Sequence, residues 1–138
     1  MQNMDEAARP EDEEFVFVAV QLFNRLPDAV VVIDETGMIK YVNDESELLF
    51  GYHRSELHGQ SIEILVPDHL KERHAEHRTH FNNEPRRRSM GSGLNLSAKR
   101  KNGGLVEVEI NLSPLSTPWG MRHIAAIRRK TAGEPARS

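Results

Sequence analysis

The sequence predicts an α+β fold, in which an antiparallel sheet has helices grouped on one of its faces. Two observations lead to this prediction. First, the patterns run along the chain as one helix, two strands, several short helices and three more strands. Second, the later part of the chain alternates apolar and polar residues with a period of two, which is typical of strands with one buried face. Because that face must be covered, we expect the middle helices to pack on it.

Length and composition fit one domain with short tails. The chain has 138 residues, 38% of them apolar, and a formal net charge of −3. An apolar content of this size favours a globular fold over disorder, and the charge gives no global nucleic-acid signature. The chain has no cysteine, which excludes disulfides, thiolate zinc sites and thiol nucleophiles.

The start of the chain and its apolar runs argue against secretion or membrane insertion. The segment MQNMDEAARPEDEE is acidic where a signal peptide would be basic and then apolar. The runs FVFVAV and AVVVI are far shorter than the ~20 residues of a membrane span. We therefore expect a soluble, cytoplasmic protein. Its expected parts are an acidic disordered tail (1–12), a flanking helix (13–26), a domain (27–130) and a disordered tail (131–138).

The flanking helix is predicted by apolar residues at helical spacing, namely Phe15, Val18, Leu22 and Leu26. Acidic residues come just before them, where a helix N-terminus favours negative charge. Further apolar residues make the stripe wide, so a second surface must cover it. Two interpretations remain open. The helix docks on its own domain, or these four residues pair with a second copy of the chain.

A hairpin and a capped short helix are expected next. Strands over 28–33 and 38–43 are joined by DETG, whose first and last residues suit a type I turn. Either Asn43 or Asp44 caps the following short helix, and Asp44 with Glu47 fits a capping box.

The remaining elements are two helical turns and three strands. Gly51 breaks the segment ELLFGYHRSEL into two short helices. Strands around 94–98 and 106–113 alternate apolar and polar residues, and the KNGG between them is a strong signal for a hairpin. TPWG makes another turn, in which we expect Trp119 to be a packing anchor between strands, before a last strand over 121–129.

The segment PDHLKERHAEHRTHF, residues 67–81, holds four of the seven histidines of the chain. At ~100° per residue, Leu70, His74, His77 and Phe81 point in one direction on a helix. Two histidines therefore lie on the apolar stripe that should face the sheet. A buried imidazole needs a hydrogen-bond partner or a metal.

Several roles for His74 and His77 remain open. Each can be a satisfied histidine that bonds to backbone or to the sheet. The pair can share a zinc ion, but three or four ligands are needed and no acidic third ligand is in view. A pH sensor would require only burial.

The other motifs do not indicate an enzyme. RRRS at Arg86 to Ser89 is a basic loop, and a run this short without aromatic residues is more typical of a solvated loop or an anion clamp than of a nucleic-acid contact. The chain contains no glycine-rich phosphate loop, serine elbow or paired-histidine zinc motif.

Taken together, the chain resembles a PAS domain, the sensor module of bacterial signalling proteins such as two-component systems. The similar segments are LPDAVVVIDETGMIKYVNDESELLFGYHRSELHGQSIEILVPD and AKRKNGGLVEVEINLSPL. The resemblance implies a five-stranded antiparallel sheet around a central cavity, with short helices on one face. It also implies an N-terminal helix that often mediates dimerisation. The side chains then expected to line the cavity are those of His74, His77, Leu94, Leu96, Ile110 and Ile124.

A narrower similarity concerns haem. Haem-binding PAS sensors of the FixL oxygen-sensor type have their proximal iron ligand in a similar Arg-His stretch, which places that ligand at His74 and makes haem b a candidate cofactor. The same resemblance offers His77, His80 or the arginines 86–88 to the haem propionates. Where that family has an arginine that contacts oxygen or a propionate, this chain has Leu94, so switching by that arginine is in doubt.

Three hypotheses for function follow. The first is a non-enzymatic sensory module that binds a small ligand and relays a signal through its N-terminal helix or last strand to a downstream partner or output domain. The second is a haem-based gas or redox sensor with His74 as axial ligand. The third is a ligand-free adaptor in which bulky side chains fill the cavity. In each, a homodimer is expected.

Overall fold

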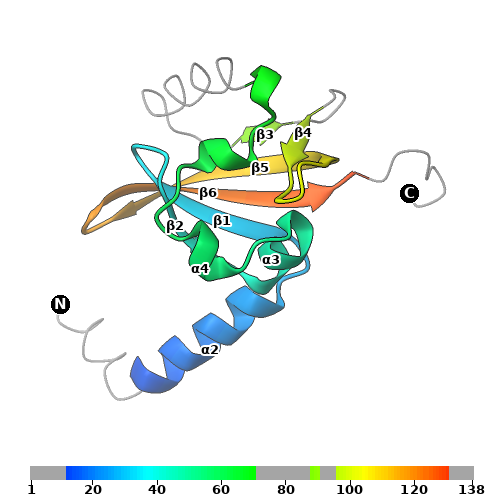
Figure 1. The fold of residues 1–138 in the computed structure, drawn as a ribbon. Coiled ribbons are helices and arrows are strands. Elements are labelled where there is room, and N and C mark those ends of the chain that lie inside the picture. Colours follow the sequence, from blue (N-terminus) through cyan, green and yellow to red (C-terminus); the bar gives the residue numbers. More distant parts are fainter. Residues whose placement is uncertain (1–11, 71–87, 91–95, 131–138) are drawn as a thin grey trace.

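The structure is a computed structural model that describes residues 12–70, 88–90 and 96–130 (Figure 1). The helices and 3-10 turns are α2 (Asp12–Arg25), α3 (Asp44–Phe50), α4 (Arg54–Leu57), η2 (Ile62–Leu65) and η3 (Asp68–Leu70). The strands are β1 (Ala29–Asp34), β2 (Ile39–Val42), β3 (Arg88–Met90), β4 (Ser97–Lys99), β5 (Leu105–Thr117) and β6 (Gly120–Arg129).

The strands form an antiparallel sheet in the order β2-β1-β6-β5-β3, and β4 also pairs with β5. Met90 lies opposite Ile110 and Ser97 lies opposite Glu107, so β3 and β4 pair with successive stretches of β5. β3 and β4 therefore share one edge position beside β5, and the sheet is five strands wide. The predicted α+β fold, with short helices on one face and a helix at the N-terminus, is confirmed (Figure 1).

Strand register decides which side chains face the short helices. Val31 lies opposite Ala125, so both project from the same face of the sheet. Both are buried in the hydrophobic core, and we call this face the inner face. Three of the short helices each place one apolar anchor in the same core: Phe50 of α3, Leu57 of α4 and Leu65 of η2. The core therefore lies between the inner face and the helices.

The predicted turns are confirmed. In the first hairpin, the Gly37 N–H donates to the Asp34 carbonyl (3.0 Å), and Asp34 Oδ1 accepts a hydrogen bond from the Thr36 N–H (2.9 Å). Gly51 ends α3 with a φ of 81°, in the left-handed region that favours glycine. In the β4–β5 hairpin, Gly103 also has a left-handed φ, of 90°.

The predicted capping box of Asp44 and Glu47 is wrong. Asn43 is the N-cap of α3, and its side chain accepts a hydrogen bond from the Ser46 N–H. Glu47 instead accepts hydrogen bonds from Arg54, the first residue of α4. Local spacing allowed either cap. Glu47 does not complete a capping box because its carboxylate bonds to Arg54, seven residues further along the chain.

The interpretation of Trp119 as a packing anchor is also wrong, because its side chain is 81% exposed. Thr117 pairs with Gly120, so only Pro118 and Trp119 lie in the loop that joins β5 to β6. The indole therefore lies at the tip of the hairpin, beyond the last pair of strand residues.

Candidate functional site

The predicted cavity residues lie partly on the inner face. Leu96 and Ile110 are half-buried and pack against the hydrophobic core, as does Leu112. These three side chains form an apolar wall beside the buried core. His74, His77 and Leu94 lie outside the described residues, so their predicted roles stay predictions.

Ile124 projects from the opposite face of the sheet, which corrects its predicted place on the inner face. It lies opposite Val32 on β1 and Ser113 on β5. The residues of β6 that share the inner face with Ile110 are instead Ala125 and its alternates along the strand. Both faces of the stretch HIAAI are apolar, so its period of two does not show which face is buried.

Sequence reasoning missed His123, which is buried on the inner face and only 2% exposed. It lies opposite Ile33 on β1 and Pro114 on β5. Burial lowers the pKa of its imidazole, and the charge of Glu35 opposes that effect only in part. His123 is therefore neutral at neutral pH. One signal in the sequence could have indicated this burial: His123 directly precedes the apolar run IAAI.

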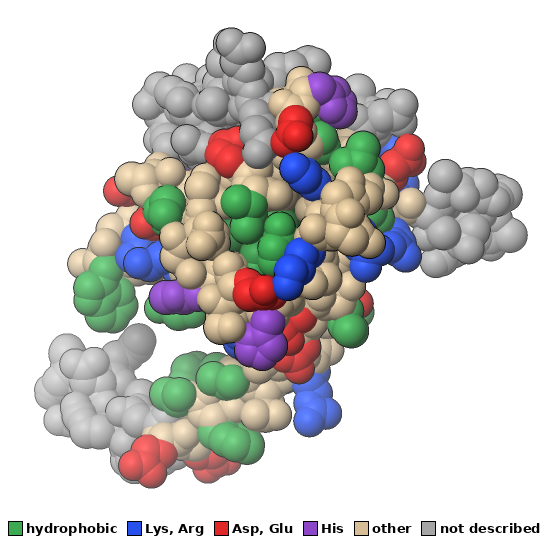
Figure 2. All heavy atoms as spheres, in the orientation of Figure 1, with side chains coloured by type: hydrophobic (Ala, Val, Ile, Leu, Met, Phe, Trp, Pro, Cys, Tyr) green, Lys and Arg blue, Asp and Glu red, His purple; other side chains and the backbone are tan. Residues whose placement is uncertain are grey.

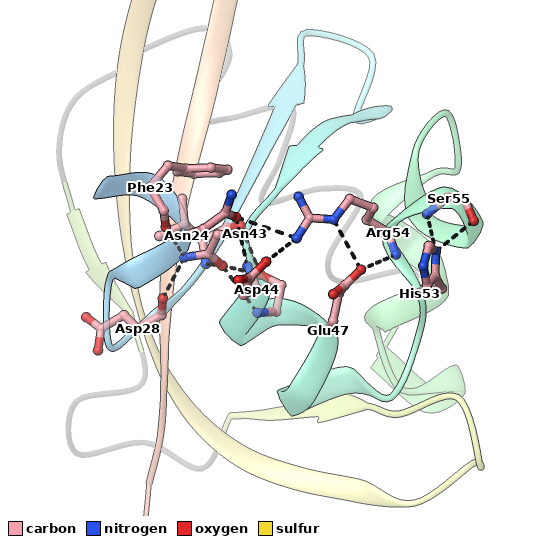
Figure 3. A network of polar contacts seen from close by, with 11 residues as sticks. Phe23, Asn24, Asp28, Asn43, Asp44, Glu47, His53, Arg54 and Ser55 are labelled. Carbon is pink, nitrogen blue, oxygen red and sulfur yellow. Dashed lines mark hydrogen bonds and ion pairs between the residues drawn. The ribbon is translucent and has the colours of Figure 1, made fainter. Parts of the chain in front are cut away.

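A polar network joins α2 to the sheet through Asn43, which is completely buried (Figure 3). Asn43 Oδ1 accepts hydrogen bonds from the Val30 N–H (2.8 Å) and the Ser46 N–H (3.2 Å). Its Nδ2 donates to the carbonyls of Phe23 (3.0 Å) and Asp28 (3.1 Å). The last carbonyls of a helix have no partner within the helix. Asn43 thus caps the C-terminus of α2 and the N-terminus of α3 at the same time.

Beside Asn43, Arg54 gathers a second set of contacts (Figure 3). Its Nε donates to Glu47 Oε2 (3.2 Å), its Nη2 forms an ion pair with Asp44, and the same nitrogen lies 3.5 Å from Asn24 Oδ1. Its backbone N–H also donates to Glu47 (2.6 Å). Burial alone would raise the pKa of Glu47, but the hydrogen bonds and charge of Arg54 lower it overall. Glu47 therefore remains ionised.

Helix α2 exposes large apolar side chains along its length. In Figure 1 it extends away from the body of the domain beside α3, and in Figure 2 apolar side chains gather along it. The exposed residues are Phe15 (69%), Val16 (58%), Phe17 (64%), Val18 (42%), Val20 (47%) and Leu22 (62%), with Leu26 (42%) just after the helix. A contiguous apolar surface of this kind marks an interaction site.

A groove of about 220 Å³ lies between α3 and the end of β6. Its lining comprises Pro27, Ala29, Glu45, Leu49, Ile127, Arg128 and Arg129. Ligand sites usually have volumes of roughly 300–1,000 Å³ and mostly apolar walls. With three charged residues around a smaller volume, this groove does not resemble such a site.

Within the described ranges, no three or more histidine, aspartate or glutamate side chains come together as a metal site. The zinc hypothesis for His74 and His77 concerns residues outside those ranges and stays a hypothesis. Among the helices that the structure describes, none has the length and apolar character needed to cross a bilayer.

Comparison with protein-family models identifies the family. The model described as PAS fold matches residues 19–129, which is most of the chain. The chain belongs to the PAS family. PAS domains are sensory modules of signalling proteins, generally not enzymes, and they commonly dimerise and relay signals to output domains.

Two curated relatives of this PAS domain are sensors. The chain is 29% identical over 98 residues to "Oxygen sensor protein DosP" of Escherichia coli (strain K12). It is 26% identical over 96 residues to "Sensor protein FixL" of Bradyrhizobium diazoefficiens. The matches cover 71% and 70% of this chain but 12% and 19% of the relatives. The chain therefore spans less than a fifth of the length of these relatives.

Solved PAS domains share the fold. The PAS domain of an HTR-like protein from Haloarcula marismortui matches with a TM-score of 0.74 at 24% identity, covering 91% of this chain and 99% of that one. The PAS domain of a protein from Colwellia psychrerythraea matches with a TM-score of 0.73 at 20% identity, covering 85% and 98%. At these identities the likeness concerns the fold alone.

Proposed function

We propose that this PAS domain is a sensory and interaction module that forms a homodimer through α2. On this proposal, a small ligand at the inner face changes the orientation of α2 or of the end of β6, and a downstream partner or output domain responds. The main support is the exposure of the stripe Phe15, Val18, Leu22 and Leu26, which ranges from 42% to 69%. Phe15, Val18 and Leu22 lie on one side of α2, and Leu26 follows directly after the helix. A ligand acts only by binding two arrangements with unequal affinity.

Sedimentation velocity of the purified chain over a range of concentrations tests the dimer. We expect the wild type to sediment as a dimer and Leu22→Glu as a monomer, because the new charge would be buried in the interface. Leu105→Glu is the matched control, since Leu105 is similarly exposed (55%, against 62% for Leu22) but lies on β5. A wild type that stays monomeric, or a Leu22→Glu variant that still dimerises, would contradict the proposal.

Native mass spectrometry of the freshly purified chain tests for a ligand at the inner face. The apolar wall of Leu96, Ile110 and Leu112 suits an apolar molecule. We expect a bound small molecule that is lost in Ile110→Gln and retained in Ile124→Gln, whose side chain projects from the other face. If the wild type shows no added mass, the ligand proposal fails and the ligand-free adaptor is favoured.

A second candidate function is haem-based sensing, favoured by the 29% identity to a protein named as an oxygen sensor. The described wall is apolar and fits the porphyrin ring in chemical character. His74 would be the axial ligand, and His77 or the arginines 86–88 would meet the propionates. Haem would supply an iron that binds a diatomic gas or changes its oxidation state.

An absorption spectrum after reconstitution with haem b separates the two candidates. Haem ligation predicts an intense Soret band that disappears in His74→Ala and persists in His69→Ala, which removes an exposed histidine of the neighbouring turn η3. Circular dichroism checks that both variants fold. A colourless wild type, or a band that survives His74→Ala unchanged, excludes His74 as the haem ligand.

A further inference from the structure

The attachment of α2 to the domain is mainly polar. Most of its large apolar side chains are exposed and therefore do not pack on the core. At its C-terminal end, the Phe23 carbonyl accepts a hydrogen bond from Asn43, and Asn24 Oδ1 accepts one from the Asp44 N–H (3.2 Å). Hydrogen bonds depend on direction, whereas apolar contacts do not. These contacts therefore constrain the angle at which α2 leaves the domain.

Arg54 connects this end of α2 to two further helices. From the start of α4, its guanidinium contacts Asn24 of α2 and both Asp44 and Glu47 of α3 (Figure 3). Only arginine presents several N–H donors in one rigid plane, so a single side chain can hold three acceptors. Asn24 is a shared acceptor, because the Asp44 N–H and the Arg54 side chain approach the same oxygen atom.

The same two helices reach the inner face. Phe50 of α3 and Leu57 of α4 are completely buried in the core. A ligand that shifts either anchor would shift the groups that hold Arg54. The side chains of Arg54 and Asp44 are 40% and 59% exposed, so their attraction is partly screened by water and salt. The contacts are thus weak enough to change while the core stays folded.

We propose that Arg54 is the positioning residue that sets the orientation of α2 relative to the PAS core, acting through Asn24, Asp44 and Glu47. This inference rests on the proposed function, since it assigns the coupling between the inner face and the helix that would dimerise. Loss of the Arg54 contacts would leave α2 attached through Asn43 but free to adopt a range of angles.

Because the chain has no cysteine, a distance between two introduced cysteines measures this orientation directly. We would place spin labels at Ala19→Cys on α2 and Ser116→Cys on β5, both exposed positions. Pulsed electron-spin resonance on doubly labelled chain, diluted into an excess of unlabelled chain, gives the distance within one copy. The wild type should give a narrow distribution.

Three variants decide the outcome. Arg54→Gln and Asn24→Ala should each lose the narrow distribution, while Lys101→Gln should keep it. Lys101 is the matched control because it also pairs with a carboxylate of α4, that of Glu56 (2.6 Å), but bridges to α4 rather than to α2. Asn24→Ala removes the acceptor on α2 for both the Arg54 side chain and the Asp44 N–H, and it leaves Arg54 bound to α3. If Arg54→Gln does not fold, Arg54→Lys decides, because lysine keeps the positive charge but not the planar set of N–H donors, so the narrow distribution should still be lost.

A narrow, unchanged distribution in folded Arg54→Gln and Asn24→Ala would overturn the inference, as would equal broadening in Lys101→Gln. A wild type already as broad as the variants would overturn it too. Sedimentation of the same samples reports dimerisation separately, so failure of the dimer proposal and failure of the Arg54 inference give different results.

Discussion

Asn43 offers the sharpest test of how α2 is joined to the sheet, because one buried side chain serves three segments. Replacing Asn43 with alanine leaves the Val30 N–H without an acceptor and the carbonyls of Phe23 and Asp28 without their donor. It also removes the side-chain cap of α3. The volume lost is small, so the cost comes mainly from unsatisfied polar groups.

The magnitude follows from these separate losses. A buried N–H left without a partner costs ~1–3 kcal/mol, and loss of an N-cap costs ~1 kcal/mol. The two carbonyls are only partly buried and can regain water, so they add little. We expect Asn43→Ala to lower the free energy of unfolding by about 3 kcal/mol, measured by urea denaturation. Asn102→Ala, in the exposed β4–β5 turn, is the control and should cost about 1 kcal/mol or less.

Asn43→Asp tests the donor role of this side chain separately from its acceptor role. A carboxylate keeps the bonds from Val30 and Ser46 but directs a second oxygen at the carbonyls that Nδ2 now serves. Burial and these carbonyls raise the folded-state pKa of the new carboxyl group above its unfolded value of about 3.9. Stability is then retained below that value and lost as pH rises through the folded pKa.

The expected result is that the deficit of Asn43→Asp relative to wild type is largest at pH near 7 and shrinks on acidification. Urea midpoints of both proteins over a pH series measure it. A deficit that does not change with pH would show that the donors of Asn43 matter little. A loss below about 1 kcal/mol in Asn43→Ala would refute the argument that buried polar groups govern this junction.

Three further predictions concern other parts of the fold. Burial lowers the pKa of His123 in the folded state, so below pH ~6.5 the unfolded chain takes up a proton that the folded chain does not. The wild type should therefore lose stability as pH falls below about 6.5. His123→Met should not show this loss, and thermal melts over a pH series measure the difference. Gly51→Ala should cost about 1–2 kcal/mol in urea denaturation, since its φ is 81°. Asp34→Ala removes three hydrogen bonds in an exposed turn and should cost about 1–2 kcal/mol by the same assay, an effect that disappears when acid protonates the wild-type carboxyl group.

Local sequence signals predicted the elements because their causes are local. The hairpin turn at Asp34, the helix break at Gly51 and the Gly103 turn depend on backbone angles or hydrogen bonds within a few residues. The period of two in β5 follows from one face being buried, and its even-numbered residues Val106 and Val108 are buried as expected.

The errors arose where the cause is distant in sequence. Asn43 bonds to Phe23, twenty residues away, and Arg54 approaches Asn24 across thirty. No local pattern encodes such pairs. In the IAAI stretch of β6 both faces are apolar, so only pairing with β1 showed that His123 points inward and Ile124 outward. The register between strands, which cannot be read from the sequence, determines which side chains of β6 face the candidate site.

The two polar junctions at the end of α2 differ in burial, and that difference gives them different roles. Asn43 has no exposed surface, so breaking its bonds carries the full cost of unsatisfied buried groups. Arg54 and its partners are partly exposed, so water replaces their contacts at little cost. A signal that shifts α3 or α4 would therefore break the Arg54 contacts first. Helix α2 would then turn about a fixed attachment at Asn43 without detaching, which is what a relay to a dimer partner requires.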